Sequence, residues 1–159
     1  MWKIVGTLLI ASFSSPAFAS ASSDAETALA RYCEPLLQGT SAGQASEMAR
    51  ADGFSDVSTG SHPALMKDEL LVMVSDNPRV CAVQASTAMT FAEGITLVDR
   101  WASRHPGAVQ SPAQRGPDGA RVKAWSAPKA NRHLLVTEQT NPRGQKVLNF
   151  ILLPIPSSQ

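Results

Sequence analysis

The stretch ELLVMVSDNPRVCAVQAS, residues 69–86, decides the fold. Residues 70–74 are apolar at every position, so a strand here carries apolar side chains on both faces. This pattern is typical of a strand that is central in its sheet or covered on both sides. The residues Asp76-Asn77-Pro78 favour a turn, after which residues 79–86 return as a second strand. The stretch therefore predicts a β-hairpin that carries Cys81.

Helices are predicted on both sides of this hairpin. Capping boxes, in which a Ser or Thr is followed three residues later by Glu or Gln, begin at Ser23, Ser41 and Thr90. The apolar helical stripe behind the first box reaches Leu36, and Pro35 within that stripe should kink the helix or end it early. Two helices are therefore expected before the hairpin and a third after it, to about residue 104.

Strands are predicted at the C-terminal end of the chain, over residues 121–126, 132–140 and 145–153. Residues 54–63 and 107–119 are rich in turn-forming residues and are expected to be connecting loops. The order ααββαβββ predicts a small α+β domain with a mainly antiparallel, five-stranded sheet and its helices packed on one face.

The N-terminal residues are typical of a secretory signal peptide. Lys3 precedes an apolar run over residues 4–13, and the small-x-small site Ala-Phe-Ala follows at residues 17–19. Cleavage is expected after Ala19, or after Ala21 in an overlapping frame. The apolar run is about half of the roughly 20 residues that a membrane-spanning helix needs.

The domain organisation follows from this pattern. Residues 1–19 are expected to be the signal peptide and residues 20–159 a single α+β domain. The mature protein is expected to be periplasmic or secreted, with no membrane span.

A disulfide is predicted between Cys33 and Cys81, the two cysteines of the chain. An even number of cysteines in an exported protein favours a bridge, which would link a helix to the sheet. Closing a loop of about 48 residues is worth roughly 4 kcal/mol in the chain-entropy model. The alternative is a thiolate nucleophile beside a histidine, which requires a free thiol of low pKa.

Charge is distributed unevenly along the chain. Residues 20–99 contain four basic and eleven acidic side chains, whereas residues 100–159 contain nine basic and two acidic ones. Such asymmetry is compatible with a basic face for anionic partners. It is equally compatible with two halves of one domain that neutralise each other when they pack together.

Motifs for metal binding or catalysis are weak. His62, His105 and His133 lack the spacing of a zinc site, and neither a G-x-S-x-G elbow nor a glycine-rich phosphate loop before a helix occurs. No metal and no cofactor are expected.

The candidate binding residues lie in the basic half of the chain. Arg121, Lys123 and Trp125 are expected to share one face of a strand, and Arg132 lies near a turn of the same meander. Arginine together with tryptophan suits an anionic ligand or a protein partner. The alternative is that they form the solvated side of an ordinary sheet.

The sequence favours a non-catalytic binding module for an anionic envelope component or a protein partner; no nucleic-acid partner is expected. The alternative is a small exported hydrolase whose site is assembled from residues far apart in the sequence, such as His62, His133 and Glu138.

Overall fold

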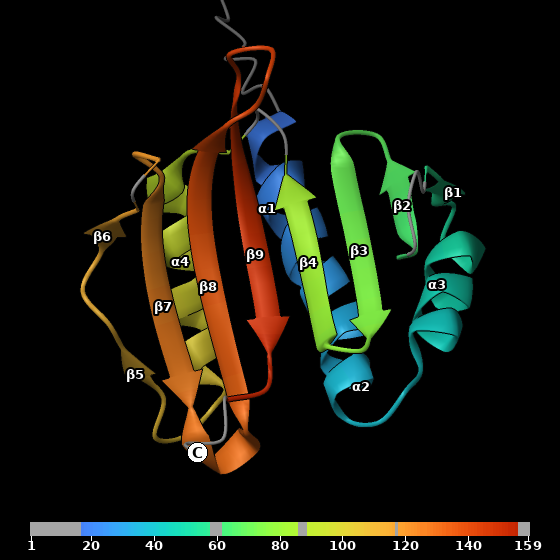
Figure 1. Ribbon diagram of the computed structural model, residues 1–159, viewed down its shortest axis with the longest axis horizontal. Helices are drawn as coiled ribbons and strands as arrows, with labels where there is room; N and C mark the ends of the chain where they lie inside the picture. The colour runs from blue at the N-terminus through green and yellow to red at the C-terminus, as the bar shows by residue number, and fades with distance from the viewer. Residues whose placement is uncertain (1–16, 58–61, 86–88, 117, 156–159) are drawn as a thin grey trace, which may run out of the picture.

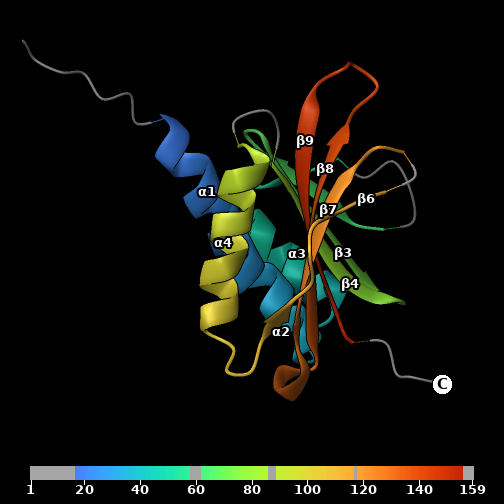
Figure 2. The same ribbon diagram turned by 90° about the vertical axis from the view of Figure 1, so that its left-hand side faces the viewer.

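The protein is built of two layers in the computed structural model, which describes residues 17–57, 62–85, 89–116 and 118–155. One layer is a nine-stranded antiparallel sheet, and helices α1 to α4 pack on one face of it (Figures 1 and 2). The helical segments are α1 (Ala17–Ala28), the π-helical η1 (Leu29–Cys33), α2 (Glu34–Leu37), α3 (Ala42–Ala51), α4 (Phe91–Ser103) and the 3-10 helix η2 (Pro128–Ala130). The strands are β1 (Ser55–Asp56), β2 (Ala64–Lys67), β3 (Leu70–Asp76), β4 (Arg79–Ala85), β5 (Val109–Gln110), β6 (Gln114–Arg115), β7 (Arg121–Ala127), β8 (Arg132–Thr140) and β9 (Lys146–Leu153). The predicted α+β fold is confirmed.

The strand order places the last strand of the chain at the centre of the sheet. The order is β1-β2-β3-β4-β9-β8-β7-β5, and β6 also pairs with β7. The predicted hairpin forms β3 and β4. On its other side β4 pairs with β9, the last strand, and Cys81 lies opposite Leu152. Helix α4 packs on β8 and β7, and the meander β7-β8-β9 leads from the far edge back to the centre.

Each of the five predicted strands is present, and four short strands extend the sheet at its two sides. The expected loop over residues 54–63 contains β1, and the expected loop over residues 107–119 contains β5 and β6. The prediction of loops is therefore wrong at these strands. Their main-chain groups pair with N–H and C=O groups that would otherwise stay open at the edges of the sheet.

Two of the three predicted capping boxes are formed. The side chains of Ser41 and Thr90 each accept a hydrogen bond from the backbone N–H three residues later in the chain. In return, the side chains of Gln44 and Glu93 accept hydrogen bonds from the backbone N–H groups of Ser41 and Thr90. The prediction of a helix start at Ser23 is wrong, because α1 already begins at Ala17. Three alanines between residues 17 and 21 favour the helical conformation, so Ser23 lies inside the helix.

Cys33 and Cys81 form the predicted disulfide. Their Cα atoms are 5.2 Å apart, and both residues are completely buried. The bridge joins the end of η1 to the middle of β4. Because it uses both thiols of the chain, the alternative of a reactive thiolate is excluded.

One face of the sheet is covered by helices, and the described residues leave the opposite face open (Figure 2). Leu70 and Val72 of β3 are buried beneath the helical layer. The alternate residues Leu71 and Met73 point to the open face and are half-buried. Of the two interpretations of residues 70–74, a central strand or a strand covered on both faces, the second does not hold within the described residues.

Helix α4 approaches the sheet most closely at Gly94. A Cβ atom at this position would lie 3.0 Å from Leu148 Cδ1 and 3.2 Å from Val136 Cγ2. Both neighbours are buried in the core and have little room to move. Glycine destabilises a helix interior by about 1 kcal/mol relative to alanine, and the close contact with β8 and β9 explains why it is present here.

Reduction of the disulfide is expected to lower the free energy of unfolding by about 4 kcal/mol, because the unfolded chain gains the entropy of an open loop. Urea unfolding with and without reductant measures this difference. The double variant Cys33→Ala, Cys81→Ala should be insensitive to reductant. Two free thiols in the protein purified without reductant would contradict the prediction.

The variant Gly94→Ala is expected to be less stable than the wild type by about 1 kcal/mol. Overpacking a core contact typically destabilises by about 1–3 kcal/mol, which exceeds the gain of about 1 kcal/mol in helix propensity. The matched control is Gly43→Ala in α3, where the nearest atom to an added Cβ is Ser41 Oγ at 3.8 Å. Urea unfolding should show this control to be neutral or stabilising; equal stabilisation of both variants would refute the packing argument.

Candidate functional site

A cavity of about 760 Å³ opens between α1, the end of α3 and the turn that joins β2 to β3. We call it the α1 cavity. Asp24, Thr27 and Ala28 of α1 form one wall, and Arg31 and Tyr32 of η1 extend it. The cavity volume lies in the range of about 300–1,000 Å³ that is usual for ligand pockets.

Pro35 shapes the helical wall of the α1 cavity. Proline has no N–H to donate to the carbonyl four residues before it, and its ring crowds that carbonyl. The helix widens just before Pro35 into the π turn η1, where the Glu34 N–H donates to the Leu29 carbonyl. Turns of this kind are rare in proteins, and those that do occur often lie at functional sites. The widened turn carries Arg31 and Tyr32. The sequence predicted that Pro35 would kink the helix or end it early, and the structure shows a π turn instead.

The carboxylate of Asp52, at the end of α3, joins the two residues of η1. It accepts hydrogen bonds from Arg31 Nε and, at 3.0 Å, from Arg31 Nη2. It also accepts one from the Tyr32 hydroxyl at 2.6 Å. These hydrogen bonds hold the pKa of Asp52 below its usual value. Burial, reinforced by the bond to Asp52, raises the pKa of Tyr32 to about 12, so its hydroxyl stays a neutral donor near neutral pH.

Aromatic rings form the floor of the α1 cavity. The rings of Tyr32 and Phe54 meet edge to face with their centroids 5.6 Å apart. Lys67 Nζ lies 5.9 Å from the centroid of the Phe54 ring and donates a hydrogen bond to the main-chain oxygen of Asp52 at 2.8 Å. Rings in this arrangement offer an apolar surface with specific geometry, and the lysine places one positive charge beside it.

The mouth of the α1 cavity is acidic. Asp24 stands on α1, and Asp68 and Glu69 stand on the β2–β3 turn; all three are exposed. The cavity lining contains four acidic and two basic side chains in total. Because Arg31 is bonded to Asp52, the net potential at the mouth favours a positively charged group.

The sequence analysis predicted none of the residues that line this cavity as binding residues. They come from α1, η1, the end of α3 and the β2–β3 turn, and no local spacing relates them. One usable signal was Pro35 inside an apolar helical stripe, because such a proline predicts a disturbed turn with side chains displaced from the regular helix.

Three of the predicted binding residues lie on the helix-covered face of the sheet. Arg121, Lys123 and Trp125 do share one face of β7, as expected, and α4 packs over it. Trp125 is 2% exposed, and its Nε1 donates to Asp99 of α4 at 3.1 Å. The guanidinium of Arg121 lies 4.5 Å from the centre of the Phe91 ring. Trp125 therefore serves helix packing.

Three basic residues in this region, Arg121, Arg132 and Lys146, have acidic partners within the chain. Arg132 is buried, and its Nε donates to Glu34 at 2.8 Å. Arg121 forms two hydrogen bonds with Glu138, at 3.0 and 2.8 Å, and Lys146 Nζ lies 3.4 Å from the same carboxylate. A second cavity of about 460 Å³ lies among Arg121, Glu138 and Lys146, where Glu138 offsets much of the positive charge.

The three residues of the hydrolase alternative do not meet. His133 and Glu138 lie on opposite faces of β8, because they are an odd number of positions apart. His62 precedes β2, and the strands β3, β4 and β9 separate β2 from β8.

The structure instead pairs His133 with Ser126, whose Oγ lies 2.8 Å from His133 Nδ1 across β7 and β8. Burial lowers the pKa of His133. Sequence analysis missed this pair, which only the register of the two strands reveals.

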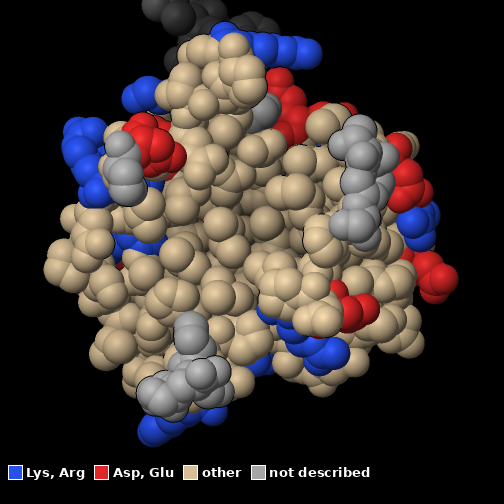
Figure 3. Space-filling model, viewed as in Figure 1, with Lys and Arg blue, Asp and Glu red and all other residues tan. Residues whose placement is uncertain are grey.

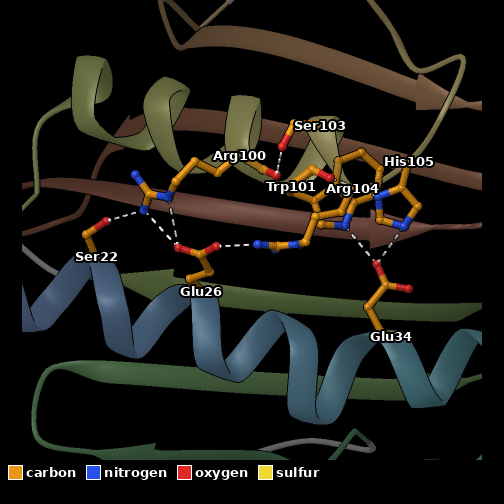
Figure 4. Close-up of polar contacts among 8 residues, drawn as sticks. All are labelled: Ser22, Glu26, Glu34, Arg100, Trp101, Ser103, Arg104 and His105. Atoms are coloured by element: carbon orange, nitrogen blue, oxygen red, sulfur yellow. Dashed lines mark hydrogen bonds and ion pairs between the residues drawn. The ribbon is translucent and has the colours of Figure 1, made fainter.

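Ion pairs join α1 to α4 (Figure 4). Glu26 of α1 lies 2.8 Å from Arg100 Nη2 and 2.6 Å from Arg104 Nη1. Burial alone would raise the pKa of Glu26, but the hydrogen bonds from Arg104 and Arg100 outweigh it and hold that pKa below its usual value. The acidic first half and the basic second half of the chain are in contact here.

Glu34 forms a second junction between the two halves. It accepts a hydrogen bond from Trp101 Nε1 at 2.7 Å and lies 3.6 Å from His105 Nε2 (Figure 4). It also accepts the bond from Arg132. The uneven charge of the sequence is therefore neutralised in part by the packing of one half on the other, and His105 has a structural role.

Comparison of the chain with protein-family models, with curated proteins and with solved structures finds no match. Among the described residues, no three His, Cys, Asp or Glu side chains are grouped so that they could hold a metal ion. Within the same ranges, no helix combines the length and the apolar character needed to cross a membrane.

Tyr32 is the one tyrosine of the chain, so the absorbance of tyrosinate reports on it alone. We expect a titration midpoint near 12 in the folded protein. In Asp52→Asn the midpoint should fall toward, but not reach, the ordinary value of about 10, because the negative charge is removed while burial persists. A midpoint near 10 in the folded wild type, with far-UV circular dichroism as the check on folding, would contradict the described hydrogen bond.

Proposed function

We propose that the protein is an exported, non-catalytic binding module that recognises a protein partner at the α1 cavity. The observation that carries the proposal is the combination of an aromatic floor, formed by Tyr32 and Phe54, with an acidic mouth in one cavity of about 760 Å³. A few converging polar groups around an apolar floor are the usual signature of a binding site.

Export is supported by two features. The N-terminal residues have the order of a secretory signal peptide, with Lys3, an apolar run over residues 4–13 and small residues at 17 and 19. The Cys33–Cys81 disulfide is buried, and disulfides form and persist in oxidising compartments such as the periplasm and the exterior. We therefore assign the mature protein to one of these compartments.

The chemistry of the cavity defines the segment of the partner that would fit. The floor favours an aromatic or long aliphatic side chain. The carboxylates of Asp24, Asp68 and Glu69 at the mouth favour a neighbouring lysine or arginine. An anionic envelope component is less well supported, because Arg121 and Arg132 already pair with Glu138 and Glu34.

The proposal is tested by selecting peptides from a random displayed library on the wild-type protein. Retained peptides should combine an apolar side chain with an adjacent Lys or Arg. The variant Thr27→Trp, at an exposed position of the cavity wall, should retain them at least 10-fold less well because the indole fills the space.

The matched control is Thr96→Trp, an exposed threonine of α4 outside the cavity lining. It should retain the peptides as the wild type does. Selection of acidic peptides, no enrichment at all, or equal retention by the two tryptophan variants would each refute the α1 cavity as the recognition site.

A further inference from the structure

The second cavity, of about 460 Å³, lies where β6, β7, β8 and β9 meet at one end of the sheet. We call it the β6 cavity. Its charged lining residues are three basic side chains and two acidic ones: Arg115, Arg121, Lys146, Asp118 and Glu138. Figure 3 shows basic and acidic side chains together at the upper left edge of the molecule, where β6 lies in Figure 1. The lining therefore carries one positive charge in excess.

Two arginines occupy directly opposite positions at this cavity. Arg115 of β6 is paired with Arg121 of β7. Residues paired in this way share one face of the sheet, and like charges directly opposite each other destabilise the pair. Glu138 lies opposite Arg121 on its other side, in β8, so it is two strands away from Arg115. The two arginines are therefore neighbours, with a paired carboxylate beside only one of them.

The guanidinium of Arg121 is held in place but keeps donors to spare. Its Nε and Nη2 donate to Glu138 at 3.0 and 2.8 Å, and its Cζ lies 4.5 Å from the centre of the Phe91 ring. The hydrogen bonds from Arg121 hold the pKa of Glu138 below its usual value, so this carboxylate stays ionised near neutral pH. Neither bond uses Nη1, which carries two further N–H groups.

Arg115 differs from the other two cations of the cavity. Within the described ranges of the chain, its side chain takes part in no hydrogen bond or ion pair. Asp118 accepts a hydrogen bond from the Ala120 N–H at 3.1 Å, and within the same ranges it forms no ion pair. Lys146 Nζ lies 3.4 Å from Glu138, and its side chain is 70% exposed. One carboxylate, Glu138, is thus shared by two cations, and the third has no acidic partner there.

We propose that the β6 cavity binds a phosphate group between Arg115, Arg121 and Lys146. An anion at this position neutralises the excess charge and relieves the repulsion between the two opposed arginines. The planar guanidinium fork matches the oxygens of a phosphate, and lysine binds phosphate as a point charge. A phosphate group presents oxygens to donors on three sides, whereas the two oxygens of a carboxylate lie in one plane. Donors from β6, β7 and β9 therefore favour phosphate.

This site does not depend on the proposed function. The α1 cavity borders the β2–β3 turn, and the strands β4, β9 and β8 lie between β3 and β7. The volume of the β6 cavity falls in the range of about 300–1,000 Å³ that is usual for ligand pockets, so it has room for the group that carries the phosphate. A soluble phosphate and the headgroup of a phospholipid share this chemistry, and two experiments separate them.

Titration with inorganic phosphate at constant ionic strength, followed by the amide chemical shifts in heteronuclear NMR spectra, tests the site. We expect shifts at residues 115–121 and 138–146 with a Kd of about 1 mM. Arg115→Gln should weaken binding about 10-fold, because charge-assisted hydrogen bonds are lost. The matched control is Arg143→Gln, at an exposed arginine of the β8–β9 turn outside the cavity lining. It changes the net charge equally and should bind phosphate as the wild type does; equal weakening in both variants would overturn the proposal.

Sedimentation with vesicles separates the two sources of the phosphate group. Vesicles of phosphatidylglycerol are compared with vesicles of phosphatidylcholine, whose headgroup has no net charge. Binding to phosphatidylglycerol by the wild type and Arg143→Gln, but not by Arg115→Gln, assigns the site to a lipid headgroup. Chemical-shift changes with inorganic phosphate but no vesicle binding assign it to a soluble phosphate. A wild type that responds to neither probe, or vesicle binding that Arg115→Gln retains without any response to phosphate, overturns the site.

Discussion

The pairing of β4 with β9 is the constraint on which the rest of the structure depends. It places the last strand of the chain beside the hairpin β3–β4, so that Cys81 lies opposite Leu152 in the middle of the sheet. Cys33 at the end of η1 bonds to Cys81 and thereby attaches the N-terminal helices to that centre. Helix α4 lies between the two pairing strands in the sequence and crosses the sheet on the same side, packed closely at Gly94.

The two layers satisfy their charges in different ways. In the helical layer, Glu26 and Glu34 of the first half of the chain pair with arginines of the second half. Because these carboxylates are half-buried, loss of the arginine partners would leave a negative charge without compensation, which is costly. On the sheet, Arg121 and Lys146 pair with Glu138 of the neighbouring strand. The α1 cavity, which we propose as the recognition site, lies on the helical side of the sheet.

Local patterns in the sequence predicted much of the fold. The apolar run at residues 70–74 followed by turn-forming residues predicted the hairpin, and the capping boxes at Ser41 and Thr90 predicted two helix starts. The same pattern failed at Ser23, where preceding alanines let the helix begin earlier. Strands β1, β5 and β6 were missed because two residues carry no periodic signal; they form where the edge of a longer strand offers main-chain partners.

The sequence by itself determined the class of fold, the disulfide and the residues that share a face within each element, because these depend on periodicity and on the small number of cysteines. What covers each face was decided only by the tertiary structure. Arg121, Lys123 and Trp125 share a face of β7 as their spacing requires, and the packing of α4 turns that face inward. The α1 cavity likewise arises where η1 meets segments distant in the sequence. The physical reason is that side-chain alternation is set by the local backbone, whereas burial depends on which other element packs there.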